Sequence, residues 1–212
     1  MSSAREEILR RVRTALDDRP EVPEVPWTYG QPVSTGDLDP VARFAERVAD
    51  YRAAVTLTTV GDVAAHVAEA LAAAGARRVV VPEGLPAQWR PTGEGIELVA
   101  DDGLGAEDLD AVDAVLTGAT LGIANTGTIV LDHGADQGRR ALTLVPDVHV
   151  CVVRADQVVT DVPEAVGRLQ QQGAHTRPLT WVSGPSATSD IELDRVEGVH
   201  GPRTLQVVIV EG

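Results

Sequence analysis

The sequence predicts an α/β fold in which a mostly parallel, open sheet is flanked by helices. Two observations lead to this prediction. From residue 41 onward, short valine-rich runs alternate with amphipathic stretches, and glycine or proline separates many of them. The run Arg78 to Val81 continues with three valines after its arginine, which is typical of a buried strand in a parallel sheet. A chain of 212 residues is long enough for one such domain with a sizeable core.

The first 40 residues have a different character. Ile8, Val12 and Leu16 recur every four residues behind a capping-box pattern, so we expect an N-terminal helix over 4–17. Five of the 13 prolines follow within 20–40, which predicts an extended connector. The chain is therefore divided into an N-terminal helix and proline-rich connector over 1–40 and an α/β domain over 41–212.

Each element of the α/β domain has its own signal. An apolar stripe that starts at Val60 indicates a helix, which Thr59 caps and Gly75 ends. Asp161 and Glu164 have the spacing of a capping box for a later helix. The expected helices are 41–50, 60–74 and 161–173, and the expected strands are 53–57, 78–81, 96–99, 114–117, 129–131, 149–153, 179–183 and 205–210.

Composition excludes several classes of function. The net charge of −14 repels phosphodiester backbones, so we expect no nucleic-acid binding. All 18 basic residues are arginine, and without lysine the chain can form neither a Schiff base nor a Walker A loop. The single cysteine, Cys151, can form no intrachain disulfide and cannot supply the four thiolates of an iron–sulfur cluster. With no secretory signal and no apolar run long enough to span a bilayer, a cytoplasmic location is expected.

A glycine-rich segment over 118–134 is the first candidate binding element. Asn125, Thr126, Gly127 and Thr128 stand directly before an apolar strand. Hydroxyl groups beside a glycine let backbone N–H groups approach an anion, which makes this segment a candidate nest for a carboxylate or a phosphate. The alternative is a turn in which Thr128 bonds its own backbone.

A second segment, 183–205, follows a predicted strand and combines hydroxyls, carboxylates, a histidine and an arginine. Open α/β sheets bind ligands beyond the carboxyl ends of their parallel strands, and we place this segment there. The alternatives are structural: Ser189 or Asp190 can cap a helix, His200 can be a turn residue, and Arg203 can pair with Asp190 or Glu192. The candidate binding residues over both segments are Asn125, Thr126, Gly127, Thr128, Gly184, Pro185, Ser186, Thr188, His200 and Arg203.

Four blocks of sequence resemble one known family. They are IANTGTIVL at 123–131, VPDVHVCVV at 145–153, SGPSATSDIE at 183–192 and GVHGPRTLQVVIV at 198–210. In this order and spacing they are similar to the lactate-utilisation protein C family, which has a LUD domain, and the resemblance covers most of the chain. It implies a fold like that of the ribose-phosphate isomerase, glucosamine-phosphate isomerase and coenzyme A transferase group. It also implies a role in oxidising L-lactate to pyruvate together with iron–sulfur partner proteins.

Two functions remain open at this point. In the first, the chain is a non-cluster subunit of a lactate-oxidising system that binds a small organic acid, with Asp190 or Glu192 as the candidate catalytic base. It then has no cofactor and no redox activity alone, and the iron–sulfur clusters reside in partner subunits. In the second, it is an independent isomerase-like or transferase-like enzyme that acts on a phosphosugar, a folate or a coenzyme A ester. A non-catalytic scaffold for the lactate-oxidising system is a third function, and a homo-oligomer is one expected form of assembly. The five histidines lack ligand spacing, so no metal site is expected.

Overall fold

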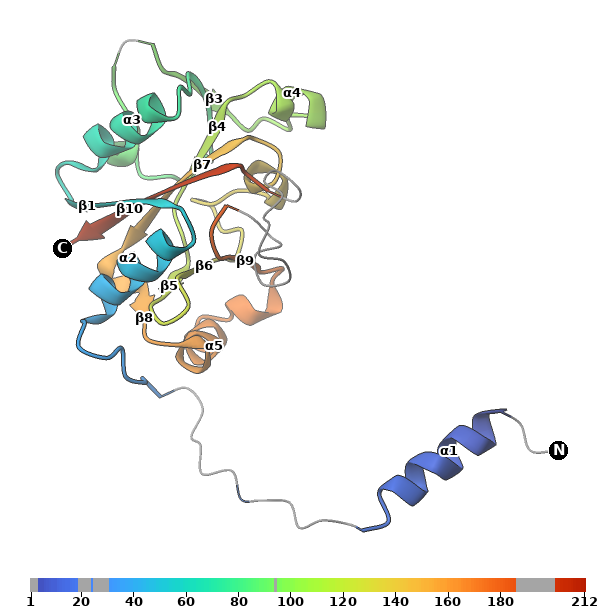
Figure 1. Cartoon of the computed structure of the whole chain (residues 1–212). Helices are drawn as coiled ribbons and strands as arrows, with labels where there is room; N and C mark the ends of the chain where they lie inside the picture. The colour runs from blue at the N-terminus through green and yellow to red at the C-terminus, as the bar shows by residue number, and fades with distance from the viewer. Residues whose placement is uncertain (1–3, 19–23, 25–30, 94, 186–200) are drawn as a thin grey trace.

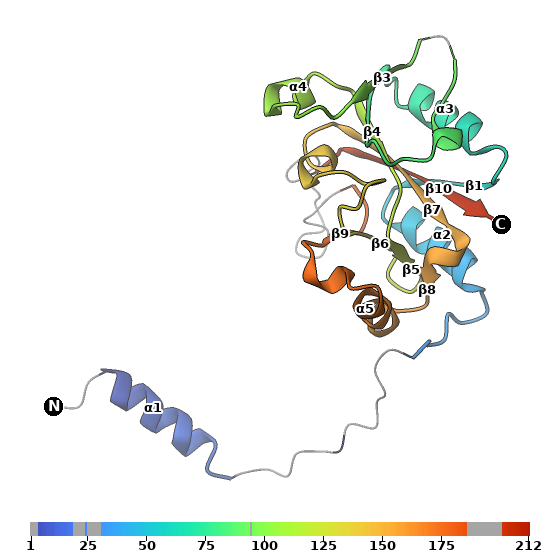
Figure 2. The ribbon, with the colours of Figure 1, turned by 180° about the vertical axis from the view of Figure 1, so that it is seen from behind.

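The computed structural model describes residues 4–18, 24, 31–93, 95–185 and 201–212, and Figures 1 and 2 show the chain from opposite sides. Its first helix, α1 (Ala4–Ala15), was expected over 4–17. None of its residues is buried, and the stripe of Ile8, Val12 and Leu16 is exposed. The apolar period therefore predicted the helix correctly, but within the described residues nothing covers its apolar face.

The larger sheet has six strands, and every pair of neighbours in it is parallel. Its two central strands, β4 and β7, are buried along almost their whole length, as expected of a parallel sheet covered on both faces. A mostly parallel α/β sheet is thereby confirmed. In spatial order its strands are β1 (Ala54–Thr59), β10 (Thr204–Glu211), β7 (Val148–Arg154), β4 (Ala114–Thr117), β2 (Arg78–Val81) and β3 (Glu97–Ala100).

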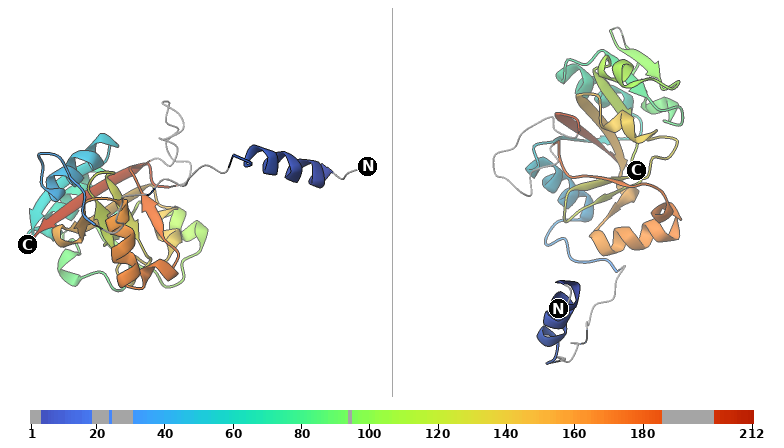
Figure 3. Two further views of the ribbon diagram at one scale, coloured as in Figure 1. Left: turned by 90° about the horizontal axis from the view of Figure 1, so that it is seen from below. Right: turned by 90° about the vertical axis from the view of Figure 1, so that its right-hand side faces the viewer.

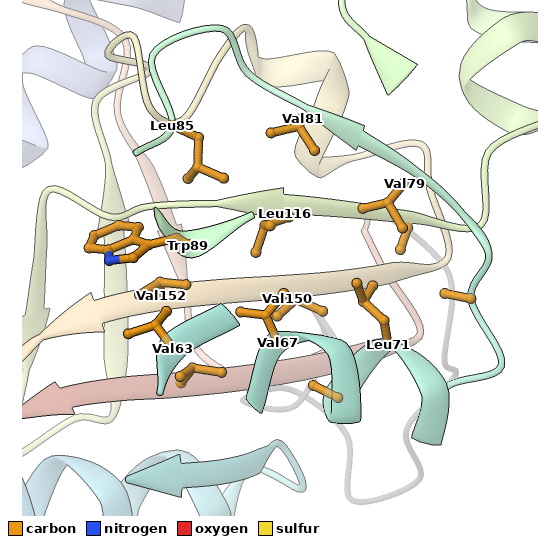
Figure 4. Close-up of a cluster of buried hydrophobic side chains, with 14 of the residues drawn as sticks. Val63, Val67, Leu71, Val79, Val81, Leu85, Trp89, Leu116, Val150 and Val152 are labelled. Carbon is orange, nitrogen blue, oxygen red and sulfur yellow. The ribbon is translucent and has the colours of Figure 1, made fainter. Parts of the chain in front are cut away.

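Helix α3 (Val63–Ala73) covers one face of this sheet. Its buried residues Val63, Val67 and Leu71 belong to the same apolar cluster as Val150 and Val152 of β7 (Figure 4). The η1 turn (Ala87–Trp89) closes one side of the cluster with its buried tryptophan. Burial of this contiguous apolar surface is the main source of the stability of this layer.

Helix α2 (Pro40–Asp50) lies on the opposite face, as Figure 1 shows. Phe44 and Val48 pack in a cluster with Cys151 of β7 and with Val207 and Ile209 of β10. These strand residues alternate with the ones that face α3, because successive side chains of a strand point to opposite faces. The short helix α4 (Ala106–Asp110) places its buried leucine in a fourth apolar cluster with residues of β2 and β4.

A smaller sheet of four strands lies beyond α2 and was not predicted. Its order is β8 (Val158–Val159), β5 (Leu121–Ile123), β6 (Thr128–Leu131) and β9 (Thr180–Val182), and β6 pairs antiparallel with both of its neighbours. Helix α5 (Val162–Gln171) packs on this sheet through Ala165 and Leu169 (Figure 3). The other face of β6 joins the cluster of α2, so the smaller sheet is joined to the larger one through a shared core.

Most expected elements are present within one or two residues of their predicted bounds. The strands over 78–81 and 114–117 have the predicted bounds. The helix that starts at Val63 corrects one expectation: Val60 is exposed, and Asp62 rather than Thr59 occupies the N-cap position. The elements β5, β8 and α4 were missed, because each is five residues or shorter and periodicity is weak over such lengths. None of the described helices has the length and apolar character needed to cross a membrane.

Two glycines with left-handed backbones allow a stability prediction. Gly127 has a φ of +60°, and a Cβ placed on it would lie 2.7 Å from the carbonyl carbon of Arg47. Gly173 has a φ of +69° and nothing within 4 Å of that position. We expect Gly173→Ala to lower the free energy of unfolding by about 1–2 kcal/mol through backbone strain alone. Gly127→Ala adds overpacking against main chain, for a total of about 3 kcal/mol or more.

Urea unfolding of both variants measures the difference. Equal losses for the two variants would mean that the Arg47 backbone gives way at no cost, which would contradict the prediction.

Candidate functional site

A cavity of about 90 Å³ lies where the two sheets meet. One wall is strand β9 with the three residues that follow it. The other is formed by the second residues of β7 and β10, His149 and Leu205, and by the segments before these strands. Thr143, His149, Thr180 and Ser183 bring hydrogen-bonding groups to the lining, and Leu144, Val182 and Leu205 bring apolar surface.

This position corrects one expectation from the sequence. Segment 183–205 was placed at the carboxyl ends of the parallel strands. The strand that precedes it, β9, instead belongs to the smaller sheet, where Val182 pairs antiparallel with Ile129. The cavity borders the amino-terminal ends of the parallel strands, because Leu144 precedes β7 and Pro202 precedes β10.

A short chain of hydroxyl groups joins the two candidate segments. Thr128 Oγ1 lies 2.8 Å from Thr126 Oγ1 on one side and 2.8 Å from Ser183 Oγ on the other. The contact with Ser183 follows from the pairing of β6 with β9, which sets Thr128 opposite it. Each hydroxyl has a single hydrogen to donate, so the direction of one hydrogen bond in this series constrains the direction of the next. The two segments are coupled in this way. Ser183, Gly184 and Pro185 line the cavity.

Asn125 and Gly127 have structural partners outside the cavity. The Asn125 side-chain amide donates to the carbonyl of Ser34 at 3.1 Å, which fastens the connector to the domain. Gly127 lies against the backbone of Arg47 in α2. Residues 124–127 form the turn between β5 and β6, and the bonds of the Thr128 hydroxyl run to the side chains of Thr126 and Ser183.

Arg203 is the one described arginine of the second segment. It pairs at 3.3 Å with Asp147, and both side chains are about 60% exposed (62% and 63%). Such a surface pair is worth little energetically. Its expected partners Asp190 and Glu192 lie outside the described residues. The remaining candidates of this segment, Ser186, Thr188, Asp190, Glu192 and His200, lie outside the described residues.

His149 is a lining residue that the sequence reasoning did not select. It is the second residue of β7, is 1% exposed, and its Nε2 lies 2.8 Å from Thr117 Oγ1. Burial lowers the pKa of His149 to about 4, so the imidazole is neutral at physiological pH. The signal was available in VPDVHVCVV, since a histidine inside an apolar strand must find a partner for its ring nitrogens.

A second polar cluster lies in the loop that follows β6 and contacts the cavity wall at Thr180 of β9. Asp132 accepts hydrogen bonds from the Thr120 hydroxyl at 2.9 Å, and its own backbone N–H donates to Gln137 Oε1 at 2.8 Å. The next residue, His133, has a φ of +57° and places its Nε2 2.9 Å from Thr180 Oγ1 in the cavity wall. A left-handed backbone at a residue other than glycine is uncommon and is maintained here by these bonds.

Asp136 belongs to the same loop and is half-buried. Burial raises its pKa above the usual range of an aspartate. Asp132 also pairs with Arg177 at 2.8 Å. Within the described ranges, no three His, Cys, Asp or Glu side chains gather in the way that metal ligands do.

Comparison with known proteins gives a consistent result. The model of the LUD domain family matches residues 100–210. A Lactate utilization protein C from Deinococcus radiodurans is 47% identical over 211 residues, which cover 99% of this chain and 96% of that protein. A Lactate utilization protein C from Geobacillus kaustophilus is 28% identical over 170 residues, which cover 72% of this chain and 70% of that protein.

A solved structure shares the fold as well. The crystal structure of a DUF162 family protein from Deinococcus radiodurans aligns with a TM-score of 0.70 and 44% identity, over 84% of this chain and 99% of that chain. Fold and sequence together define a LUD-domain protein. The chain belongs to the lactate utilization protein C family, which confirms the resemblance seen in the four sequence blocks.

The buried histidine generates a pH prediction. An unfolded histidine binds a proton below about pH 6.5, whereas His149 in the folded protein does so only near pH 4. Its contribution to stability is therefore complete above pH 6.5 and is lost as the pH falls toward 4. Between pH 7.5 and 4.5 this loss should amount to about 2–3 kcal/mol, and His149→Gln should lack it.

The measurement is chemical unfolding of wild type and His149→Gln at several pH values, with the exposed His175→Gln as control. The control should follow the wild type at every pH. A constant gap between wild type and His149→Gln over this range would show that His149 does not titrate abnormally.

Proposed function

We propose that this chain is the non-cluster subunit of an L-lactate oxidation system and that it binds a small organic acid in the cavity between the two sheets. Membership of the lactate utilization protein C family supports a role in lactate utilization. We further propose a cytoplasmic location, with which the single, buried thiol of Cys151 is compatible.

The observation that carries the proposal is the combination of size and lining in this cavity. A volume of about 90 Å³ corresponds to about three water molecules, which is the scale of a molecule with a few heavy atoms. Hydrogen-bonding groups of His149 and Ser183 face it together with the apolar side chains of Val182 and Leu205. A short hydroxy or oxo acid has both kinds of surface, whereas the cavities of drug-sized ligands are several times larger.

Arg203 is the proposed partner of the ligand carboxylate. It directly follows Pro202, which lines the cavity. Its present bond to Asp147 is exposed and long, so little free energy opposes the transfer of the guanidinium to a ligand. A charge-assisted, two-pronged hydrogen bond is the usual way in which arginine recognises a carboxylate.

Iron–sulfur partner proteins complete the proposed system. Oxidation of lactate to pyruvate releases two electrons, which side chains cannot store. A chain with one cysteine cannot supply the four thiolates that usually hold an iron–sulfur cluster, so the proposal assigns electron transfer to partners. The role of this chain is then to bind and orient the acid.

Binding of the acid is tested by calorimetry and thermal shift with L-lactate and pyruvate, with a phosphosugar, a folate and coenzyme A for comparison. We expect the short acids to bind. Arg203→Ala should weaken that binding ten-fold or more, up to the order of a hundred-fold, because a charged hydrogen bond contributes roughly 1.5–3 kcal/mol. The matched control is Arg154→Ala, which removes another exposed arginine paired with an aspartate.

Both arginine variants should melt close to the wild type, since exposed pairs stabilise little. Unchanged affinity in Arg203→Ala, or binding of the larger ligands alone, would contradict the proposal.

The division of labour is tested separately through lactate-dependent dye reduction. The purified chain should reduce no dye by itself, and addition of the iron–sulfur partner proteins should make lactate-dependent reduction measurable. Substantial turnover by the chain alone would contradict the assignment and would favour an independent enzyme.

A further inference from the structure

His149 stands at one end of a buried row of hydrogen-bonding groups. Its Nε2 lies 2.8 Å from Thr117 Oγ1 on the neighbouring strand β4. Thr117 Oγ1 lies 3.8 Å from Cys151 Sγ, and Cys151 Sγ lies 3.5 Å from the carbonyl oxygen of Gly118. His149, Thr117 and Cys151 are almost completely buried, so each hydrogen in the row needs an acceptor within the protein.

The last group of the row sets the direction of every bond in it. The Gly118 carbonyl can only accept, so the Cys151 thiol donates to it. The sulfur is then free to accept the Thr117 hydroxyl hydrogen, and Thr117 Oγ1 accepts from the ring. If Thr117 instead donated its single hydrogen to the ring nitrogen, none would remain for Cys151 Sγ, and the row would contain one hydrogen bond fewer.

Two properties of the end groups keep this direction fixed at physiological pH. Burial raises the pKa of Cys151 to about 12, so the thiol retains the hydrogen that it donates. His149 is neutral and carries one ring hydrogen, which the row places on Nε2. The other ring nitrogen, Nδ1, is then a hydrogen-bond acceptor on a side chain that lines the cavity.

We infer that Nδ1 of His149 accepts a hydrogen bond from the hydroxyl group of a 2-hydroxy acid and thereby makes the cavity selective for the hydroxy acid over the corresponding 2-oxo acid. This inference rests on the proposed binding of a short acid. A hydroxyl can donate to Nδ1, whereas a keto oxygen can only accept and would face a second acceptor. His149 is in this sense the specificity-determining residue, and Thr117 is a positioning residue that acts through it.

The expected selectivity follows from the cost of a buried acceptor without a donor. Penalties of that kind correspond to preferences on the order of ten- to a hundredfold. L-lactate should therefore bind this chain about ten to a hundred times more tightly than pyruvate. The two acids have the same carboxylate and methyl group, so their difference isolates the oxygen that His149 contacts.

The first test reads the tautomer without any ligand. Nitrogen-15 spectra of the full-length protein labelled at histidine distinguish a bare ring nitrogen from a protonated one, and His149→Gln identifies which signals belong to His149. We expect a bare Nδ1 and a protonated Nε2. Thr117→Val should release this preference, because it keeps the shape of the side chain and removes the hydroxyl. Thr117→Ser retains the hydroxyl and is the matched control.

The second test measures the affinities of L-lactate and pyruvate for the same proteins. Wild type and Thr117→Ser should show the preference for lactate, and Thr117→Val should lose most of it. Addition of lactate should shift the Nδ1 resonance of the wild type, and pyruvate should not.

The outcomes separate this inference from the proposed function. A protonated Nδ1 in the free wild type would overturn the inference. Equal affinities for L-lactate and pyruvate in a protein whose Nδ1 is bare would do the same, and both results would leave acid binding intact. If neither acid binds to the wild type, the proposed function itself is wrong, whatever the tautomer.

Discussion

The double-sided burial of β7 is the constraint on which the rest of the structure depends. Six of its seven residues are buried, with α3 covering one face and α2 the other. Such a strand tolerates polar side chains only where the neighbouring strand supplies hydrogen-bond partners. β4 does so with Thr117, which pairs in register with Cys151 and also reaches His149. The polar side chain that β7 contributes to the cavity, His149, therefore depends on the parallel pairing of β7 with β4 in the centre of the sheet.

The smaller sheet supplies the other half of the site. Its antiparallel pairing of β6 with β9 brings Thr128 against Ser183, and this contact joins two segments that are far apart in the sequence. Glycine is required in both segments because helix α2 and the residue that caps its C-terminus, Tyr51, lie so close. A Cβ on Gly127 would meet the backbone of Arg47, and one on Gly184 would lie 2.7 Å from Tyr51 Cβ. Tight packing against α2 thus sets the shape of these loops.

Local patterns predicted the parallel layer well, because continuous apolar strands and capped helices depend on near neighbours in the sequence. The smaller sheet escaped prediction for a physical reason. Leu121–Ile123 contains Gly122, which resembles a turn residue, yet a side chain there would collide with the ring of Phe44. Arg203 shows the same limit, since its partner Asp147 lies 56 positions away in the sequence. His149 was missed because its partner Thr117 is on another strand, and pairing of strands is a tertiary property.

The place of β10 in the sheet has a consequence for how the chain acquires its structure. β1 is an edge strand whose partner in the sheet is β10, and the paired residues are about 150 positions apart in the sequence. On the ribosome, β1 emerges long before the strand that must lie between it and β7. During that interval the main-chain groups of β1, and those on the edge of β7 that later pairs with β10, have no strand partner. Completion of the sheet is consequently a late event, and the nascent chain carries open strand edges of the kind that chaperones shield.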